Sequence, residues 1–268
     1  MAELIGHVAV ITGGAGGLGV AFARAFASAG ADLLIVDLAE DKNAAVESEL
    51  RRAYPERTIH ARRVDLRNPA EIAQAFVHLD REFGRVDFVI NNAGIHDVGP
   101  FRRLTLDEWR RVFAINVDAP MLVSQHALER MEQQVPSEVN GCRGKIINVG
   151  SAAAEVADPL AAAYGASKAA LRYLTHNLAA GYASALISTT ILYPGSVWEG
   201  MWHNLAESVA AVQGRLPAEV RQERLDATPT GRFQSAEAVA EIALFVAKSM
   251  HMSQNGRVIW TDARSVPA

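Results

Sequence analysis

The sequence of 268 residues lacks the features that mark several common classes of protein. Its one cysteine, Cys142, cannot form a disulfide within the chain, which fits a reducing compartment. No uncharged apolar run reaches the roughly 18 residues that a membrane-spanning helix needs. The first residues contain neither a basic segment nor the cleavable apolar run of a signal peptide. We therefore expect a cytoplasmic protein that does not enter a membrane.

Concentrated charge is also absent. The formal net charge is −4, and lysines and arginines are scattered along the chain, which argues against nucleic acid or an anionic membrane as the main partner. Cys142 has no nearby motif that supplies a base, so we do not interpret it as a nucleophile, and we predict no metal site. Half of the residues are hydrophobic, enough for a sizeable core. With no linker, repeat or low-complexity tract, we predict one domain over residues 1–268.

Apolar runs typical of strands alternate along the chain with helical patterns, which predicts an α/β fold with a parallel sheet covered by helices on both faces. We expect strands over residues 7–12, 32–37, 59–66, 86–94, 144–151, 186–194 and 256–262, and helices over 20–30, 41–53, 69–84, 106–132, 164–183 and 235–248. A polar stretch over 133–144 predicts a surface loop. Residues 195–230 are irregular and are expected to hold the substrate loop.

The first strand runs into the glycine-rich segment TGGAGGLG, residues 12–19, which opens a helix. Glycines at 13, 17 and 19 let the backbone turn tightly and approach a pyrophosphate, while the helix N-terminus offers free N–H groups. Taken alone, the glycines could serve only the geometry of the turn. Together with the alternating elements, they predict a Rossmann-like, doubly wound sheet of about seven strands that binds a dinucleotide.

Asp37 ends the second predicted strand. An acid at this position accepts hydrogen bonds from both hydroxyl groups of an adenosine ribose and repels a 2′-phosphate. The next residue is Leu38, not a basic residue. We therefore expect NAD rather than NADP, although an acid here would also suit the start of the next helix.

Tyr164 and Lys168 are four residues apart in the alanine-rich run AAAYGASKAAL and therefore share one face of a helix. A tyrosine with an ordinary pKa near 10 is a poor base at neutral pH. A nearby ammonium group favours the phenolate and lowers that pKa. A tyrosine tuned in this way can take a proton from an alcohol. By itself, such a pair more often lies on the protein surface and has no catalytic role.

Several further motifs stand in order along the chain: NNAG at 91–94, Asn116 in a long helix, Ser151 before Tyr164, and PGSV at 194–197. With TGGAGGLG and YGASK, they resemble the motifs of the classical short-chain dehydrogenases/reductases, from about residue 4 to residue 260. The resemblance implies an NAD-dependent oxidoreductase that acts on a secondary alcohol or its ketone.

The resemblance also implies roles for individual residues. Tyr164 is the general acid/base, Lys168 lowers its pKa and binds the nicotinamide ribose, Ser151 polarises the substrate oxygen, and Asn116 supports a proton relay. Asp65 is similar to the acid that contacts the adenine amine. The implied cofactor-binding residues are Gly13, Gly17, Leu18, Gly19, Asp37, Asp65, Leu66, Asn91, Ala93, Gly94, Tyr164, Lys168, Pro194, Gly195 and Val197.

The chain departs from the family pattern after the PG turn, where Glu199 stands near the position of a frequent threonine. An aromatic lid over an apolar substrate is our hypothesis for this region, with Trp198 and Trp202 in the lid. These tryptophans would otherwise only pack the lid or a subunit contact. His96 and Glu155 are further candidates for substrate contacts.

The resemblance implies a homotetramer or a homodimer whose substrate is a small alcohol or ketone. The main alternative is an NADP(H)-dependent carbonyl or 3-oxoacyl reductase, which Asp37 argues against. A nucleotide-sugar epimerase is disfavoured by the glycine spacing. A non-catalytic NAD-sensing protein is a third alternative, but all four residues of the implied catalytic tetrad are present. We expect the loop at 133–144 to lie away from that tetrad.

Overall fold

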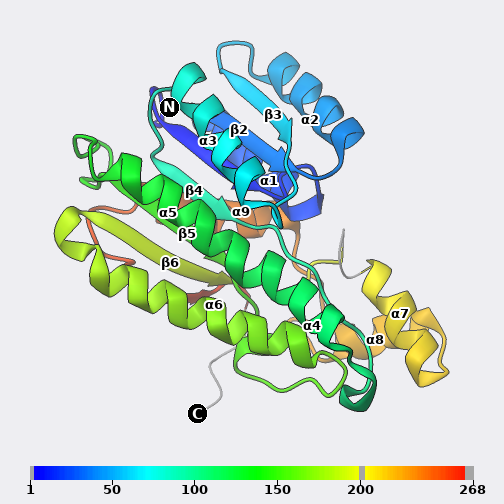
Figure 1. The fold of residues 1–268 in the computed structure, drawn as a ribbon. Coiled ribbons are helices and arrows are strands. Elements are labelled where there is room, and N and C mark those ends of the chain that lie inside the picture. The colour runs from blue at the N-terminus through cyan, green and yellow to red at the C-terminus, as the bar shows by residue number, and fades with distance from the viewer. Residues whose placement is uncertain (1–2, 199–202, 263–268) are drawn as a thin grey trace.

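The computed structural model describes residues 3–198 and 203–262, which form a single domain. Its centre is a parallel sheet with the strand order β3-β2-β1-β4-β5-β6-β7 (Figure 1). The predicted α/β fold, with about seven parallel strands, is therefore confirmed. The strands span Val8–Thr12 (β1), Asp32–Asp37 (β2), Ile59–Arg63 (β3), Phe88–Asn91 (β4), Gly144–Val149 (β5), Ile187–Tyr193 (β6) and Val258–Trp260 (β7).

Helices connect the strands and cover both faces of the sheet (Figure 1). They span Gly17–Ser28 (α1), Glu40–Ala53 (α2), Pro69–Glu82 (α3), Leu106–Phe113 (α4), Ala119–Met131 (α5), Ala162–Gly181 (α6), His203–Gln213 (α7), Pro217–Asp226 (α8) and Ala236–Lys248 (α9), with short 3₁₀ turns at Phe101–Arg103, Ala152–Ala154 and Ala183–Ala185. None of the helices in the described ranges is long and apolar enough to span a bilayer.

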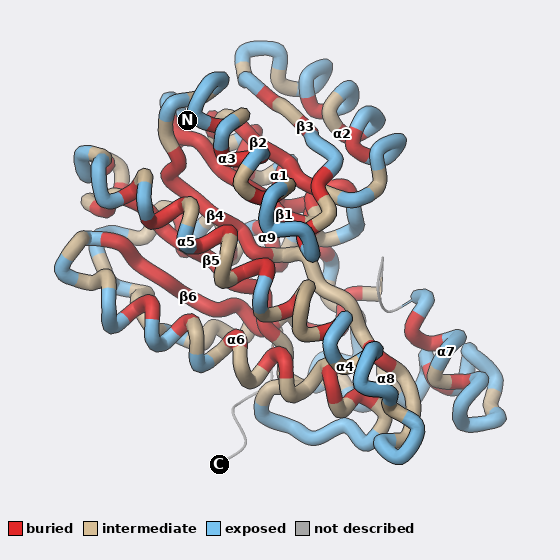
Figure 2. Tube along the Cα trace, viewed as in Figure 1, coloured by how far each residue is buried: buried red, intermediate tan, exposed pale blue. Residues whose placement is uncertain are grey.

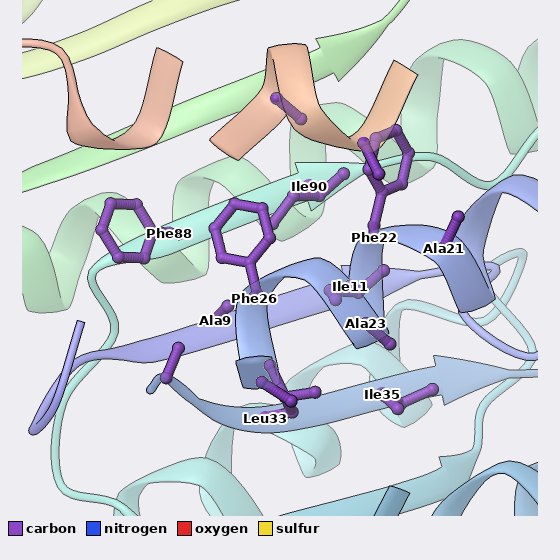
Figure 3. Packing of buried hydrophobic residues seen from close by; sticks show 14 of the residues in the cluster. Ala9, Ile11, Ala21, Phe22, Ala23, Phe26, Leu33, Ile35, Phe88 and Ile90 are labelled. Carbon is purple, nitrogen blue, oxygen red and sulfur yellow. The ribbon is translucent and has the colours of Figure 1, made fainter. Parts of the chain in front are cut away.

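Alternate residues of each central strand enter two separate cores. Ala9 and Ile11 of β1 pack with α1 and α9 on one face (Figure 3), whereas Val8 and Val10 pack with α3 and α5 on the other. Strands that are covered on both faces need apolar residues at nearly every position. This explains the continuous apolar runs of the sequence and the buried central strands in Figure 2.

The strand order reverses direction between β1 and β4. Strands β2 and β3 lie on one side of this pair, and β5, β6 and β7 on the other. The connections after β1 and β4 therefore leave the sheet toward opposite sides and open a crevice at the carboxyl ends of the strands. The glycine loop follows β1 and the NNAG motif follows β4, so both border this crevice.

The long helix expected over 106–132 is present but not uniform. Residues Ala114–Asp118 form one π-helical turn between α4 and α5. Such turns carry wider hydrogen-bonded rings and frequently occur at functional sites. This one contains Asn116.

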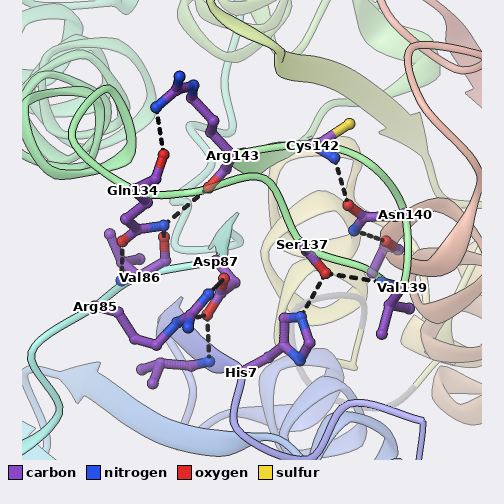
Figure 4. A network of polar contacts seen from close by, with 12 residues as sticks. His7, Arg85, Val86, Asp87, Gln134, Ser137, Val139, Asn140, Cys142 and Arg143 are labelled. Carbon is purple, nitrogen blue, oxygen red and sulfur yellow. Dashed lines mark hydrogen bonds and ion pairs between the residues drawn. The ribbon is translucent and has the colours of Figure 1, made fainter.

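The loop over 133–144 is less exposed than predicted, because it packs at the amino ends of the strands (Figure 4). His7 Nε2 and Ser137 Oγ are 2.6 Å apart. Asn140 donates from Nδ2 to the carbonyl of Ala247 at 2.9 Å, near the end of α9, and Cys142 is buried. The polar side chains that suggested a surface loop instead satisfy backbone groups of neighbouring segments.

Two helices occupy the irregular region that follows β6. Ala206 and Ala210 of α7 are buried against Val220 of α8, so these helices form a small core of their own beside the sheet. Figure 1 shows the pair beyond the carboxyl ends of the strands.

Candidate active site

The glycine loop closes tightly over the first turn of α1. Gly13 has a φ of +62°, in the left-handed region that favours glycine. A Cβ atom on Gly19 would lie 2.1 Å from the carbonyl oxygen of Gly13, so only glycine fits there. Asn92 donates from Nδ2 to the carbonyls of Thr12 and Gly13, both at 3.0 Å, and thereby fixes the loop to the end of β4.

The N-terminus of α1 offers its free N–H groups without competition from a capping side chain. The N-cap residue is Gly16, which has no side chain to bond to these N–H groups. A Cβ atom there would meet only the carbonyl oxygen of Gly13, at 3.9 Å, so the space beside it is open. An open, positively polarised helix start beside a close-fitting glycine backbone fits the pyrophosphate of a dinucleotide.

The Asp37 carboxylate lies at the carboxyl end of β2, beside the glycine loop. It accepts hydrogen bonds from the backbone N–H groups of Ala15 at 3.2 Å and Ala39 at 3.1 Å. These bonds hold the acid at the wall of the crevice.

Asp65 follows β3 and pairs with Arg67. The guanidinium group donates from Nε at 2.9 Å and from Nη2 at 2.6 Å to the two carboxylate oxygens. This bonding holds the pKa of Asp65 at about 2. Asp65 is therefore ionised at neutral pH, and Arg67 adds a cation to the crevice wall that the sequence analysis did not anticipate.

Tyr164 lies in the first turn of α6, beside Ser151. Burial raises the pKa of Tyr164 above its usual 10, and the side-chain hydrogen bond with Ser151 and the positive charge of Arg224 oppose this rise. Ser151 Oγ also accepts the N–H of Ala153 at 3.2 Å, which fixes its side chain. Arg224 comes from α8, far away in sequence.

Lys168 occupies the same face of α6 as Tyr164, as the spacing predicted. Its ammonium nitrogen lies 5.6 Å from the centroid of the Tyr164 ring and donates to the carbonyl of Val149 at 2.8 Å. Burial lowers the pKa of Lys168 from its usual 10.5 to about 8. The side chain is thus charged at neutral pH but readily gives up its proton.

Asn116 is completely buried behind this pair. Its Oδ1 accepts the N–H of Ile95 at 2.9 Å, and its Nδ2 donates to the carbonyl of Ile95 and to Ser167 Oγ, both at 2.9 Å. The π turn thereby joins the segment after NNAG to α6. Asn116 does not itself border the crevice within the described residues.

His96 and Asp97 follow the NNAG motif. The imidazole stacks on the ring of Tyr164, with 4.1 Å between centroids and 25° between planes. The Asp97 carboxylate accepts the N–H groups of Tyr164 at 2.8 Å and of Ala163 at 3.3 Å, and so caps α6 from another segment. Sequence reasoning missed Asp97, because the capping residue stands far outside the helix that it caps.

The PG turn after β6 borders the same crevice. Gly195 donates its N–H to Gln234 Oε1 at 3.0 Å, and a Cβ atom at this glycine would lie 2.8 Å from Asp262. Ser196 Oγ accepts a hydrogen bond from Arg224 Nε at 2.9 Å. Arg224 is therefore joined to the turn that follows the PG motif.

Together these segments enclose a cavity of about 900 Å³. Most of the predicted site residues line it: Gly13, Gly17, Leu18, Gly19, Asp37, Asp65, Leu66, Ala93, Gly94, His96, Ser151, Tyr164, Lys168, Pro194, Gly195 and Val197. Lining residues that the sequence analysis did not single out include Asn92, Arg67, Arg111, Leu205, Arg224 and Trp260. Within the described chain, no group of three or more acidic, histidine or cysteine side chains is arranged to hold a metal ion.

Besides Asn116, three described candidates are not among the residues lining this cavity. Asn91 is buried and donates to Asn148 Oδ1 at 2.8 Å, while its neighbour Asn92 lines the cavity. Glu155 pairs with Arg172 and accepts a hydrogen bond from a tyrosine of β6. Trp198 packs on Phe233, with 5.1 Å between centroids. Trp202 and Glu199 lie outside the described residues.

Burial also raises the pKa of the Cys142 thiol. The thiol donates to the carbonyl of His251 at 3.0 Å, within the loop at the amino ends of the strands. A buried thiol with a raised pKa is a weak nucleophile, in agreement with the interpretation drawn from the sequence.

Comparison with known proteins agrees with this geometry. The short chain dehydrogenase family profile matches residues 7–210. Galactitol 2-dehydrogenase of Agrobacterium fabrum is 31% identical over 247 residues, 92% of each chain. The 3-oxoacyl-(acyl-carrier-protein) reductase FabG of Aquifex aeolicus is 28% identical over 257 residues, 96% of each chain. The crystal structure of NAD⁺-bound xylitol dehydrogenase is 25% identical, with a TM-score of 0.88, over 97% of this chain and 99% of that one. The chain therefore belongs to the short-chain dehydrogenase family of oxidoreductases.

Proposed function

We propose that the protein transfers a hydride between NAD(H) and a secondary alcohol or the corresponding ketone. The observation that carries this proposal is that the glycine loop and Asp37 line the same cavity as Ser151, Tyr164 and Lys168. As a member of the family, the protein uses a nicotinamide cofactor, which supplies or accepts the hydride when bound. The protein residues then have to hold the substrate oxygen and move one proton.

Tyr164 moves that proton in the proposed reaction. In the direction of oxidation, its phenolate takes the proton of the alcohol hydroxyl group, while Ser151 donates a hydrogen bond to the same oxygen. In the direction of reduction, the phenol returns a proton to the oxygen of the former ketone. The hydrogen bond from Ser151 and the positive charge of Arg224 favour the phenolate. In the proposed mechanism the Lys168 ammonium, 5.6 Å from the centroid of the ring, does the same. Asn116 holds the surrounding segments together.

NAD is the proposed cofactor because of Asp37. Two backbone N–H groups hold its carboxylate at the cavity wall, where a 2′-phosphate would meet a like charge. Arg67, which also borders the cavity, is the one observation that favours NADP. Its guanidinium group is already paired with Asp65.

Titration of NADH and NADPH, followed by nicotinamide fluorescence, tests this preference. We expect NADH to bind at least about a hundredfold more tightly, because bringing like charges together costs several kcal/mol. Asp37→Asn should reduce the difference in affinity between NADH and NADPH. Equal binding, or tighter binding of NADPH, would favour a carbonyl or 3-oxoacyl reductase instead.

Turnover tests the role of Tyr164. Tyr164→Phe should reduce kcat by about a thousandfold or more, because general acid–base catalysis contributes on the order of 10²–10⁴, while NADH binding stays intact. A variant that kept most of its rate would contradict the mechanism. If the wild-type protein bound NADH but oxidised no secondary alcohol, it would instead be a sensor of the cofactor.

We also propose a homotetramer or a homodimer. Phe101, Leu106 of α4 and Tyr173 of α6 are strongly exposed apolar side chains, which subunit contacts would cover. Light scattering coupled to size-exclusion chromatography distinguishes these assemblies from a monomer.

A further inference from the structure

The position of the His96 ring relative to Tyr164 is fixed. The imidazole stacks on the phenol ring with 4.1 Å between centroids, and both residues line the cavity. Asp97, the next residue, accepts backbone hydrogen bonds from Ala163 and Tyr164. The segment that carries His96 is therefore fixed to the same turn of α6 that carries Tyr164.

The hydrogen bond of His96 determines which ring nitrogen carries the proton. Nδ1 lies within hydrogen-bond distance of the backbone carbonyl oxygen of Asp97. A carbonyl oxygen can only accept, so Nδ1 must donate. Burial lowers the pKa of His96 below its usual 6.5, which keeps the ring neutral at neutral pH. Nε2 then carries a lone pair and is a hydrogen-bond acceptor.

This acceptor is available to a ligand. Among residues 3–198 and 203–262, no side chain or backbone group donates a hydrogen bond to His96 Nε2. Nε2 is also absent from the set of fully buried polar atoms that lack a partner, so part of its surface is exposed. It is thus accessible from the cavity that the ring borders. A group bound there has to bring its own donor hydrogen.

We propose that His96 Nε2 accepts a hydrogen bond from a second hydroxyl group of the substrate, on the carbon next to the reacting one. This inference rests on the proposed oxidoreductase function. Because the imidazole stacks on the tyrosine that would hold the reacting oxygen, we expect the substituent on the neighbouring carbon to lie beside it. The preferred substrates are then vicinal diols and longer polyols.

Other substituents fit this position less well. An alkyl group covers Nε2 and leaves it without a partner, which is how a site built for a hydroxyl group rejects analogues that lack one. A carboxylate brings only lone pairs to a nitrogen that also has a lone pair. The cavity does contain the cationic side chains of Arg111 and Arg224, so an anionic substrate is the competing outcome.

Three probes with one four-carbon skeleton separate these possibilities: 2,3-butanediol, 2-butanol and 3-hydroxybutyrate, with each stereoisomer measured separately. The measured quantity is the ratio of kcat/KM for the diol to kcat/KM for 2-butanol. A general loss of activity cancels in this ratio. We expect the wild-type ratio to exceed about ten, because an unsatisfied buried acceptor costs about a factor of ten to a hundred.

Three variants of His96 test the assignment. His96→Phe keeps a ring to stack on Tyr164 but removes both nitrogens, and we expect the ratio to fall to about one. His96→Asn retains a donor for the Asp97 carbonyl but has no group at the position of Nε2, and it should behave like the phenylalanine variant. His96→Gln carries an amide oxygen that can reach the position of Nε2, and it should retain part of the preference.

The outcomes distinguish this inference from the proposed function. Three results would overturn the role of His96: a wild-type ratio near one, a ratio unchanged in both His96→Phe and His96→Asn, or a higher kcat/KM for 3-hydroxybutyrate than for the diol. Oxidation of 2-butanol would still support the proposed function in each case. Turnover of none of the three probes by protein that binds NADH would overturn both. Circular dichroism and NADH binding show that each variant is folded.

Discussion

Gly16 and Gly19 belong to one loop and line one cavity, yet their surroundings differ. A Cβ atom on Gly19 would lie 2.1 Å from the carbonyl oxygen of Gly13 and 2.7 Å from the Cα atom of Gly14. Both are backbone atoms, which cannot move without opening the loop. A Cβ atom on Gly16 would make one ordinary contact, with the carbonyl oxygen of Gly13 at 3.9 Å. Gly19 is therefore required by the fold, whereas Gly16 leaves room for a ligand.

Alanine at each position separates these two requirements. Gly19→Ala should destabilise the protein by about 1–3 kcal/mol, as overpacking does, and abolish NADH binding. Gly16→Ala should change stability by less than about 1 kcal/mol but weaken NADH binding about tenfold, because its methyl group occupies the helix start where the phosphates are expected. Urea denaturation and NADH fluorescence measure the two effects. Equal losses of stability would contradict this distinction.

At this scale the sequence predicted the residues facing the cavity well wherever one motif fixed the local geometry. In the NNAG motif we predicted Asn91, whereas its neighbour Asn92 lines the cavity. Neighbouring residues at a strand end point to opposite sides, and the motif does not indicate which side is which. Arg224 could not have been predicted either, because its position beside Tyr164 depends on how α7 and α8 pack.

At the scale of the element, the start of α6 depends on a residue outside it. Ala161 is the N-cap and makes no side-chain hydrogen bond. Asp97 accepts the N–H groups of Ala163 and Tyr164 instead. The first turn of the helix, which carries Tyr164, is therefore fixed by the segment after NNAG.

Removing this cap should loosen that turn. Asp97→Ala should cost about 2 kcal/mol of the free energy of unfolding, since a lost cap and buried N–H groups without a partner each cost on the order of 1 kcal/mol. Asp97→Asn keeps one acceptor oxygen and should restore about half of the loss. Urea denaturation of the wild type and the two variants measures the order of their free energies of unfolding. An alanine variant as stable as the wild type would show that the cap contributes nothing.

The sequence predicted most elements because a parallel sheet covered on both faces needs long apolar strands, and HVAVIT and DLLIVD supply them. It could not reveal the π turn at Ala114–Asp118, because one wider ring hardly disturbs the apolar spacing of a long helix. It also predicted a surface position for Ser137 and Asn140, which are buried. Polarity identifies a loop, but it does not indicate whether backbone groups of other segments will satisfy its side chains.

At the scale of the whole molecule, two buried lysines lie toward opposite ends of the sheet and differ in their surroundings. At the amino end of β5, the Lys145 ammonium donates to the carbonyls of Val246 and Ser249 and to Ser249 Oγ, at the C-terminus of α9. Helix C-termini attract cations. At the carboxyl end, Lys168 donates to one carbonyl, that of Val149. Lys145 thus has three hydrogen-bond acceptors, although burial lowers its pKa as well, whereas Lys168 has only the one acceptor named here.

The same substitution should therefore have opposite effects on stability. Lys145→Met removes the donor of three hydrogen bonds, two of them to the half-buried Ser249, and should lower the free energy of unfolding by about 2–3 kcal/mol, while kcat stays close to that of the wild type. Lys168→Met removes a charge that burial disfavours and should raise the stability of the cofactor-free protein by about 2 kcal/mol at pH 7, at the expense of activity.

The effect of Lys168→Met on stability should depend on pH. The pKa of Lys168 is about 8 in the folded protein and 10.5 in its unperturbed state, so between these values the unfolded chain binds more protons and the wild type gains stability as the pH rises. The advantage of Lys168→Met should be largest below pH 8 and should vanish toward pH 10.5. Denaturation midpoints at pH 7 and 9.5, at one protein concentration, measure it. A Lys168→Met protein less stable than the wild type at pH 7 would mean that the Val149 hydrogen bond outweighs the cost of burying the charge.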